Sequence, residues 1–240
     1  MKILDKLEII DLGLKYKDIL IVGDVHIGLE GVFLKQGIML PVNQLDNTIK
    51  RLEKIIKKAK PKTIIINGDL KEEFGTISDQ EWKDTTKLIN FLKEKSKIIL
   101  IKGNHDIVLA PIAKKFNLPI YERFDIDQIS VIHGDLIIKD LRKTIIIGHE
   151  HPAITFRERP DEKYKCFLLG RYKKHNLIVM PSFNILIEGS DITKEQHLSP
   201  YIKNISNFQI FVIQDKAYDF GKVKNLQQSN FKVNHSFVRS

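Results

Sequence analysis

The chain has 240 residues, of which 42% are hydrophobic and 29% are charged, a balance that suits a globular protein with a substantial core. Its formal net charge of +9 suits a polyanionic partner, although a lysine-rich composition gives the same total without one. No apolar run reaches the roughly 18 residues of a membrane span, and early charges exclude a signal peptide, so we expect a cytoplasmic protein with no membrane contact.

The first half of the chain alternates strand and helix patterns. Aliphatic runs that lead into glycine turns predict strands at residues 18–22, 63–67 and 97–101. Apolar residues at helical spacing predict a helix over residues 43–60. Ser78 and Glu81 form the capping-box pattern, which predicts the start of a second helix.

Beyond about Pro119 the pattern changes to short strands, which are predicted at residues 129–132, 144–147, 153–156, 164–169, 177–180 and 208–213. Strand–helix units followed by strands favour an α/β protein in which two packed sheets have helices outside. No linker divides the chain, so we expect residues 1–240 to form a single domain. The only cysteine, Cys166, excludes an internal disulfide and is expected to be a small core residue.

Polar side chains follow the predicted strands in five blocks: Gly23-Asp24-Val25-His26, Gly68-Asp69, Gly103-Asn104-His105-Asp106, His133-Gly134-Asp135 and Gly148-His149-Glu150-His151. In an extended backbone residues i and i+2 point to the same side, so the first and last blocks can each aim two side chains at one centre. Taken singly, each block is compatible with a solvated turn. Jointly that reading is poor, because five of the eight histidines fall in these blocks. His175, His197 and His235 lie outside and are interpreted as surface or structural residues.

The order D-x-H, G-D, G-N-H-D, H, G-H-x-H resembles the complete signature of the calcineurin-like metallophosphoesterase superfamily, and it runs from Gly23 to His151. Residues 24–30, residues 67–71 and the run Pro181-Ser182-Phe183-Asn184 are similar to archaeal SbcD-related, ICC-like phosphoesterases. Bacterial relatives of that group include ligase-associated DNA-repair endonucleases. The resemblance implies a four-layer αββα sandwich with two central β-sheets flanked by helices. One position departs from it, because Glu72 stands where a histidine is expected.

The resemblance also implies a centre of two divalent metal ions. One ion would be held by Asp24, His26, Asp69 and His151, and the other by Asp69, Asn104, His133 and His149, with Asp69 as the bridge. Carboxylate, carboxamide and imidazole ligands without thiolate suit Mn²⁺, our first expectation, with Fe²⁺, Zn²⁺ and Ni²⁺ as alternatives. Two such ions about 3.5–4 Å apart activate a shared hydroxide that attacks phosphorus.

Two residues of the third block are left for catalysis. His105 is expected to face the leaving oxygen as a general acid or charge stabiliser, with a structural role as the alternative. Asp106 is expected either to orient the His105 ring or to play a structural part.

The expected substrate is a phosphodiester. Phosphoprotein phosphatases of this superfamily carry arginines in G-D-x-V-D-R-G and R-G-N-H-E, whereas this chain has Glu73 and Lys102 at those places. A second hint is a run of cations interleaved with aromatic residues: Arg157, Arg159, Lys163, Tyr164, Lys165, Phe167, Arg171, Tyr172, Lys173 and Lys174. Such a run suits single-stranded or distorted nucleic acid, and equally a solvated hairpin with core aromatics.

These patterns together predict a metal-dependent phosphodiesterase that acts as a nuclease on nucleic acid. One alternative is a hydrolase of cyclic or other small nucleotides, which needs a closed pocket instead of an open basic groove. A non-catalytic scaffold with the same fold is the third possibility, and it is disfavoured because the ligand blocks and His105 are intact.

Overall fold

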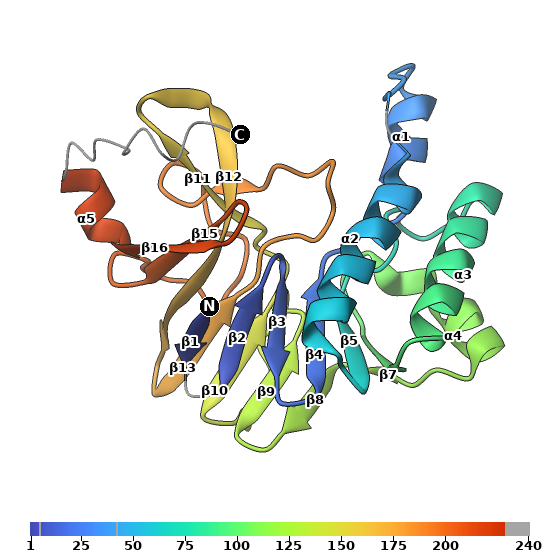
Figure 1. The fold of residues 1–240 in the computed structure, drawn as a ribbon, viewed down its shortest axis with the longest axis horizontal. Helices are drawn as coiled ribbons and strands as arrows, with labels where there is room; N and C mark the ends of the chain where they lie inside the picture. Colours follow the sequence, from blue (N-terminus) through green and yellow to red (C-terminus); the bar gives the residue numbers. More distant parts are fainter. Residues whose placement is uncertain (5, 42, 229–240) are drawn as a thin grey trace.

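Two mixed β-sheets pack face to face and carry helices on their outer sides (Figure 1). The computed structural model describes residues 1–4, 6–41 and 43–228. The first sheet has the order β1 (Lys2–Leu4), β2 (Leu7–Ile10), β3 (Gly13–Tyr16), β4 (Ile19–Gly23), β5 (Thr63–Asn67), β6 (Lys97–Ile101) and β7 (Ile120–Tyr121). Strands β1 to β4 form an antiparallel meander, and β4 to β7 are parallel.

The second sheet contains the later strands in the order β14 (Ser190–Asp191), β11 (Pro152–Phe156), β12 (Arg159–Tyr172), β13 (His175–Val179), β10 (Thr144–Ile147), β9 (Ile129–Ile132) and β8 (Arg123–Ile126). Two further strands, β15 (Gln209–Ile213) and β16 (Ala217–Lys222), extend from β12. Strands β9, β10 and β13 are parallel to one another, as β4 to β6 are in the first sheet. Parallel strands end at the same edge, so each sheet gathers several strand ends at one place.

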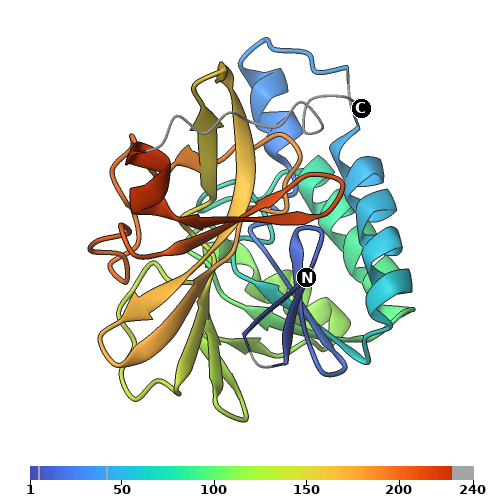
Figure 2. The ribbon, with the colours of Figure 1, turned by 60° about the vertical axis from the view of Figure 1, so that its left-hand side comes forward.

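The helices are α1 (Leu29–Lys35), α2 (Gln44–Ala59), α3 (Asp79–Lys93), α4 (Ala110–Phe116) and α5 (Val223–Gln228), with a short 3₁₀ turn at Asp106–Val108. Figures 1 and 2 show α2, α3 and α4 beside the first sheet and α5 beside the C-terminal strands of the second. None of the helices in the described part of the chain combines the length and apolar character that a membrane crossing needs.

Alternating side chains along the second sheet divide the core in two. Ile146 and Phe167 face the layer between the sheets, whereas Ile145 and Cys166 face a second cluster on the other side. That outer cluster is closed by apolar residues of the segment before β15, including Tyr201 and Phe208. The period of two along a strand explains the split, because neighbouring side chains point to opposite faces. The prediction that Cys166 is a core residue is confirmed, since it is fully buried.

The capping box predicted at the start of α3 is only half formed. Ser78 Oγ accepts a hydrogen bond from the Glu81 amide at 3.2 Å, as predicted. The Glu81 carboxylate does not return to Ser78 but accepts from the Glu72 and Glu73 amides at 2.7 and 2.8 Å. The helix start therefore holds the turn that follows β5, next to Asp69.

The predicted α/β fold of two central sheets is confirmed, and the strands predicted at 63–67, 97–101, 129–132 and 144–147 match those of the structure. Several elements were not predicted, among them the meander β1–β3 and the helices α1 and α4. The meander strands have only three or four residues each, too short for a reliable alternation pattern. The strand predicted at 164–169 is part of a 14-residue strand, β12.

Candidate metal centre

The predicted metal ligands come together from both sheets. Asp24 and His26 follow β4, Asp69 follows β5 and Asn104 follows β6, all in the first sheet. His133 follows β9, and His149 and His151 follow β10, in the second sheet. Their donor atoms form overlapping three-residue groups whose members lie within 4.8 Å of one another: Asp24 with His26 and His151, His26 with Asp69 and His105, and Asp69 with His133 and His149. The centre therefore lies where the two sheets meet at their strand ends.

The first group is compact. His26 Nε2 lies 3.3 Å from His151 Nε2, and His151 Nε2 lies 3.3 Å from Asp24 Oδ1. The Asp24 carboxylate also accepts the His149 amide at 3.1 Å, so it joins the turn after β4 to the turn after β10. Asp24 is fully buried and His26 is almost so.

The second group is centred on Asp69. His133 Nε2 lies 3.4 Å from Asp69 Oδ2 and 2.9 Å from Asn104 Oδ1, and the rings of His133 and His149 meet edge to face at 5.0 Å. Asp69 Oδ2 is also 3.7 Å from His26 Nε2, which belongs to the first group. Asp69 therefore lies between the two groups, the position that a bridging ligand requires.

The backbone reaches this arrangement by left-handed turns and not by extended segments. Positive φ angles occur at five of the predicted ligands: Asp24, His26, Asp69, His149 and His151. Our expectation of an extended backbone within the first and last blocks is therefore wrong, although each block does deliver both side chains to the centre. Non-glycine residues in this region carry a conformational cost that the surrounding contacts have to offset, and such residues cluster at functional sites.

Two glycines give the acidic and imidazole groups room. A Cβ on Gly103 would lie 2.1 Å from Asp69 Oδ1, and a Cβ on Gly68 would lie 2.0 Å from His133 Nδ1. Gly68 also has a φ of 79°, which side chains rarely adopt. Gly68 and Gly103 are thus required by close packing against candidate ligands.

Opposite charges compensate within the centre. Burial opposes the ionisation of Asp24, but the neighbouring His151 and His133 outweigh it and hold the pKa of Asp24 below its usual range. The pKa of Asp69 is lowered in the same way, mainly through His133. Burial acts to lower the pKa of His133, but the hydrogen bond with Asp69 and the charge of Asp24 raise it to about 9. Two buried carboxylates therefore create a strong demand for positive charge.

The donor set fits divalent ions. Ligand atoms about 2.1 Å from one ion and at right angles lie about 3 Å apart, close to the 3.3 Å separations of the first group. His26 Nδ1 is committed as a donor to a carboxylate, so its Nε2 presents a lone pair to His151 Nε2. Two imidazole nitrogens at this distance repel each other unless a cation or a proton lies between them. Oxygen and imidazole donors without sulfur suit Mn²⁺, Fe²⁺, Ni²⁺ and Zn²⁺.

Glu72, which stands where the family resemblance predicts a histidine, contacts a candidate ligand of this centre directly. Its carboxylate accepts from His26 Nδ1 at 2.6 Å, which fixes the ring so that Nε2 faces the other ligands. Burial works to raise the pKa of Glu72, but the contact with His26 outweighs it and leaves the pKa lowered. The sequence marked Glu72 only as an anomaly, and nothing local indicated that it would reach a residue 46 positions away.

His105 lies beside the centre, and its ring is oriented by an unexpected partner. His105 Nδ1 donates to the Glu72 carbonyl at 2.7 Å, which leaves Nε2 free to face a substrate. The Asp106 carboxylate instead accepts backbone amides, from Gly103 at 3.0 Å and Leu70 at 3.1 Å. Of the two roles considered for Asp106, these contacts match the structural one: Asp106 ties two ligand-bearing turns together, and burial raises its pKa to about 7.

The run Pro181-Ser182-Phe183-Asn184 supports the turn after β4 from behind. Ser182 Oγ donates to the Asp24 carbonyl at 2.8 Å, and Asn184 Nδ2 donates to the His26 carbonyl at 3.0 Å. Lys165 Nζ donates to the Ser182 carbonyl at 2.8 Å and to the Asn184 carbonyl. These three residues were not predicted as part of the site, although the resemblance had singled out the run itself.

The basic cluster predicted after His151 does not form one surface. Arg159 and Arg171 lie at the two ends of the 14-residue strand β12. Lys165 is turned inward onto carbonyl groups, and Phe167 is fully buried in the core. Arg159 pairs with Glu162 at 2.6 Å. The run therefore forms two separate basic ends, and Phe167 at its middle is buried, as the hairpin with core aromatics implies.

The histidines outside the blocks behave as expected where they are described. His197 Nδ1 lies 3.1 Å from the buried carboxylate of Glu150, and His175 Nδ1 donates to the Arg142 carbonyl at 2.6 Å. Neither belongs to a candidate metal group. His235 lies outside the described residues.

Two mixed sheets with an aspartate- and histidine-rich centre between them define an α/β protein suited to holding two divalent ions. The chain belongs to the calcineurin-like phosphoesterase family, whose pattern matches residues 17–182. Members of this family are hydrolases of phosphoester bonds and typically depend on two metal ions, for which the aspartate and histidine groups described above provide donors.

Solved structures with similar folds include the nuclease MPE of Pseudomonas putida, at 18% identity and a TM-score of 0.62, covering 88% of this chain and 92% of that one. The phosphoesterase Yfce of E. coli is also similar, at 13% identity and a TM-score of 0.46, covering 85% of this chain and 97% of that one. A search of curated proteins found no match.

Proposed function

We propose that this protein is a metal-dependent phosphodiesterase and that its substrate is nucleic acid. The choice of a diester as the substrate rests on the number of carboxylates around the centre. Glu72 adds a third carboxylate beside Asp24 and Asp69, through its contact with His26. Against two bound divalent ions, these three carboxylates leave only about one net positive charge, which favours a monoanionic diester over a dianionic phosphomonoester.

The two places where phosphoprotein phosphatases carry arginine supply no clamp for a terminal phosphate. The Glu73 carboxylate pairs with Lys35 and accepts the Ser78 amide at 3.0 Å. Lys102 is half exposed and lies 3.8 Å from Glu122. Bidentate arginine contacts are the usual means of holding a dianionic phosphate, so these partners favour a diester.

The proposed roles of the residues follow from their positions. Asp24, His26, Asp69 and His151 would hold one ion, and Asp69, Asn104, His133 and His149 the other. Bound divalent ions supply charge neutralisation at phosphorus and lower the pKa of water. His105, with Nδ1 held by the Glu72 carbonyl, presents Nε2 for protonating or stabilising the leaving oxygen.

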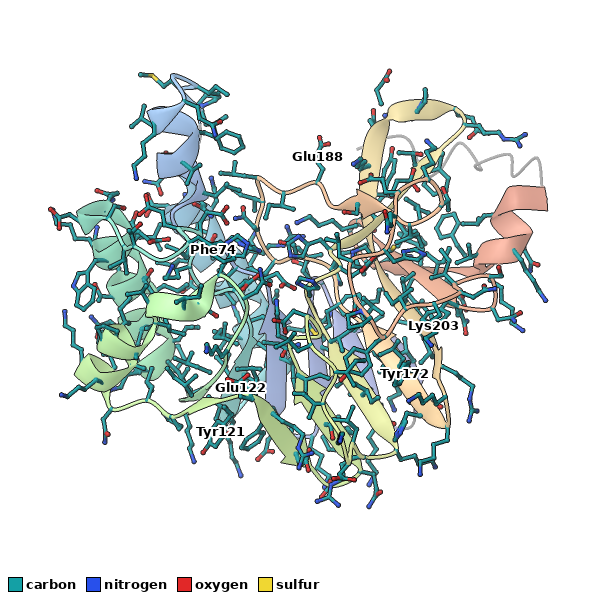
Figure 3. All side chains as sticks on the ribbon, turned by 180° about the vertical axis from the view of Figure 1, so that it is seen from behind. Phe74, Tyr121, Glu122, Tyr172, Glu188 and Lys203 are labelled. Atoms are coloured by element: carbon teal, nitrogen blue, oxygen red, sulfur yellow. The ribbon has the colours of Figure 1, made fainter. Side chains whose placement is uncertain are left out.

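Three observations support nucleic acid as the substrate. The resemblance to SbcD-related phosphoesterases points to it, and the similar fold from Pseudomonas putida is that of a nuclease. In addition, α1 and the β11–β12 hairpin project at the same end of the molecule from two sides (Figures 1 and 3). The hairpin carries Arg157 and Arg159 at its turn, and β11 begins directly after His151.

The test is a matrix of metals and substrates with the purified full chain. Mn²⁺, Fe²⁺, Ni²⁺ and Zn²⁺ are each combined with a single-stranded and a double-stranded oligonucleotide, cyclic nucleotides, bis(p-nitrophenyl) phosphate and p-nitrophenyl phosphate. We expect Mn²⁺-dependent cleavage of oligonucleotides and of the chromogenic diester, with little turnover of the monoester. Turnover of the monoester above that of every diester would refute the proposal.

The two ends of β12 provide a matched pair of variants. Arg157→Ala with Arg159→Ala should weaken oligonucleotide cleavage and flatten its dependence on salt, by roughly 0.7 in the log–log slope for each phosphate that is no longer neutralised. Arg171→Ala with Lys174→Ala removes the same charge from the opposite end and should leave both quantities unchanged. Neither variant should affect the chromogenic diester. Equal effects of the two variants would contradict a nucleic-acid path over the hairpin.

A hydrolase of cyclic or other small nucleotides is the second candidate. It is favoured by the division of the basic cluster, since no continuous cationic groove is needed for a small substrate. Preferential turnover of cyclic nucleotides in the matrix, with no effect of either double variant, would select this candidate.

A further inference from the structure

The turn after β5 places an exposed aromatic ring at the centre. Phe74 is 54% exposed, and its ring meets the His105 ring at a centroid distance of 4.5 Å. The His105 ring in turn lies 4.9 Å from the ring of His26. A single imidazole therefore separates Phe74 from a candidate metal ligand.

The turn that carries Phe74 is held by several contacts. Glu81 accepts the amides of Glu72 and Glu73, and Lys71 Nζ donates to the Glu73 carbonyl. The Glu73 carboxylate pairs with Lys35 at the end of α1. Because these contacts hold the backbone beside Phe74, binding of a ligand to the ring has less backbone freedom to remove, which lowers the entropy lost on binding.

The position of the ring relative to His105 sets which part of a substrate it can meet. His105 Nδ1 is bound to the Glu72 carbonyl, so Nε2 is the nitrogen available to a leaving oxygen. A group attached to that oxygen is within reach of Phe74, because the Phe74 and His105 ring centroids are only 4.5 Å apart. Aromatic side chains bind nucleobases by stacking, because every base has a π-face.

We propose that Phe74 forms a nucleobase subsite, in which its exposed ring stacks on the base of the nucleotide whose oxygen leaves. This inference rests on the proposed phosphodiesterase activity and specifies its substrate: a diester that carries an aromatic base on the leaving side. Phe74 then contributes to substrate binding, while the ligand-bearing residues and His105 serve the chemistry.

The test uses three dimers with one phosphodiester bond: thymidine on both sides, and two dimers in which a tetrahydrofuran abasic unit replaces one nucleoside or the other. On the all-thymidine dimer, Phe74→Ala should lower kcat/KM by about 5- to 150-fold, mainly through KM. On the dimer that lacks the leaving-side base, wild type should already show this loss, and Phe74→Ala should add less than about 3-fold.

Further variants separate stacking from support of His105. Phe74→Leu keeps apolar contact with the imidazole but has no aromatic face, so it should behave as Phe74→Ala does, whereas Phe74→Trp should retain wild-type KM. Tyr121, the other exposed large aromatic residue among those described, lies at the far end of the sheet in Figure 3. Tyr121→Ala is the matched control and should leave all three dimers unaffected. Equal losses for Phe74→Ala on all three dimers, expressed in kcat, would overturn the proposal.

A binding measurement keeps this inference separate from the proposed function. Phe74→Trp adds one tryptophan to a chain whose only other is Trp82. An oligothymidylate should quench its fluorescence beyond the change seen in wild type, and an abasic strand of equal length should not. Quenching without any diester cleavage would refute the phosphodiesterase and keep the base subsite, while cleavage without base-dependent quenching would refute the subsite.

Discussion

Glu72 is a residue outside the candidate ligands that orients one of them, His26. Its carboxylate fixes the Nδ1–H tautomer of His26, so that Nε2 faces Asp69 and His151. Hydrogen bonds to the outer nitrogen of a metal-binding histidine orient the ring and raise its basicity.

We expect Glu72→Ala to weaken metal binding by about 10- to 100-fold, because His26 loses the partner that fixes its ring. Glu72→Gln should recover part of the affinity, since its amide oxygen still accepts a hydrogen bond. Glu73→Ala is the neighbouring control, as Glu73 bonds Ser78 and Lys35 and not the centre. Calorimetric titration of the metal-free proteins with Mn²⁺ measures the difference, and equal affinities for Glu72→Ala and wild type would contradict the orienting role.

The acid–base contribution of His105 can be measured separately from metal binding. His105→Ala should lose about 10²- to 10⁴-fold in rate on an oligonucleotide, the usual size of an acid–base contribution. On bis(p-nitrophenyl) phosphate the loss should be much smaller, because an activated leaving group needs no proton. The measurement is the rate on each of the two substrates, with the Mn²⁺ content of the variant checked by metal analysis. Equal losses on both substrates would show that His105 positions the substrate and does not protonate the leaving oxygen.

At the scale of elements, β12 and the run Pro181-Ser182-Phe183-Asn184 act together through Lys165. Its Nζ donates to two carbonyls of the run, and the run supports the backbone of Asp24 and His26. Burial lowers the pKa of Lys165 to about 7. The folded pKa thus lies below the value of about 10.4 expected for an unfolded lysine.

This difference predicts a pH dependence of stability. Between about pH 7 and 10.4 the unfolded chain holds a proton on Lys165 that the folded chain has released, so the free energy of unfolding gains a contribution that rises with pH. Below pH 7 both states are protonated, and the cost of burying the charge is fully present. Lys165→Met should lack this rise in denaturant melts across the window. Lys163→Met, which removes an ion pair with Glu195, should keep it, and parallel profiles for Lys165→Met and wild type would contradict the mechanism.

At the scale of the whole molecule, the centre joins the two sheets. Asp24 and Asp69 come from the first sheet, whereas His133 and His151 come from the second, so an ion bound there links both halves. Ligands that bind only the folded state stabilise it by mass action.

Mn²⁺ at about 100 times its Kd should therefore raise stability by about 2.7 kcal/mol, on the order of 5–10 °C in Tm. Asp69→Asn removes the central carboxylate and should abolish both the shift and the activity. Without metal, Asp69→Asn should melt somewhat lower than wild type, because the attraction between Asp69 and His133 outweighs the repulsion between Asp69 and Asp24. A full metal-induced shift and unchanged turnover in Asp69→Asn would refute the two-metal assignment.

The sequence alone was sufficient for the two-sheet fold and for the seven candidate ligands. Aliphatic strands such as 63–67 and 97–101 are local patterns, and each ligand block directly follows one of them. That all of these residues would meet at one centre was implied by the resemblance to the metallophosphoesterases, which have the same blocks in the same order. The metal-binding role of these residues, the assignment of each to a particular ion, and the extent of a single domain over residues 1–240 stay predictions.

Tertiary structure decided the partners of those ligands. His26 meets Glu72 across 46 positions and Asn184 across 158, and no periodicity within either segment encodes such a contact. The same holds for Phe74 on His105 and for the two distant ends of β12, which a run of cations in the sequence presented as one cluster. The physical reason is that local patterns report burial and backbone geometry along one element. Which side chains touch depends on how separate elements pack, and that is fixed only when the whole core is assembled.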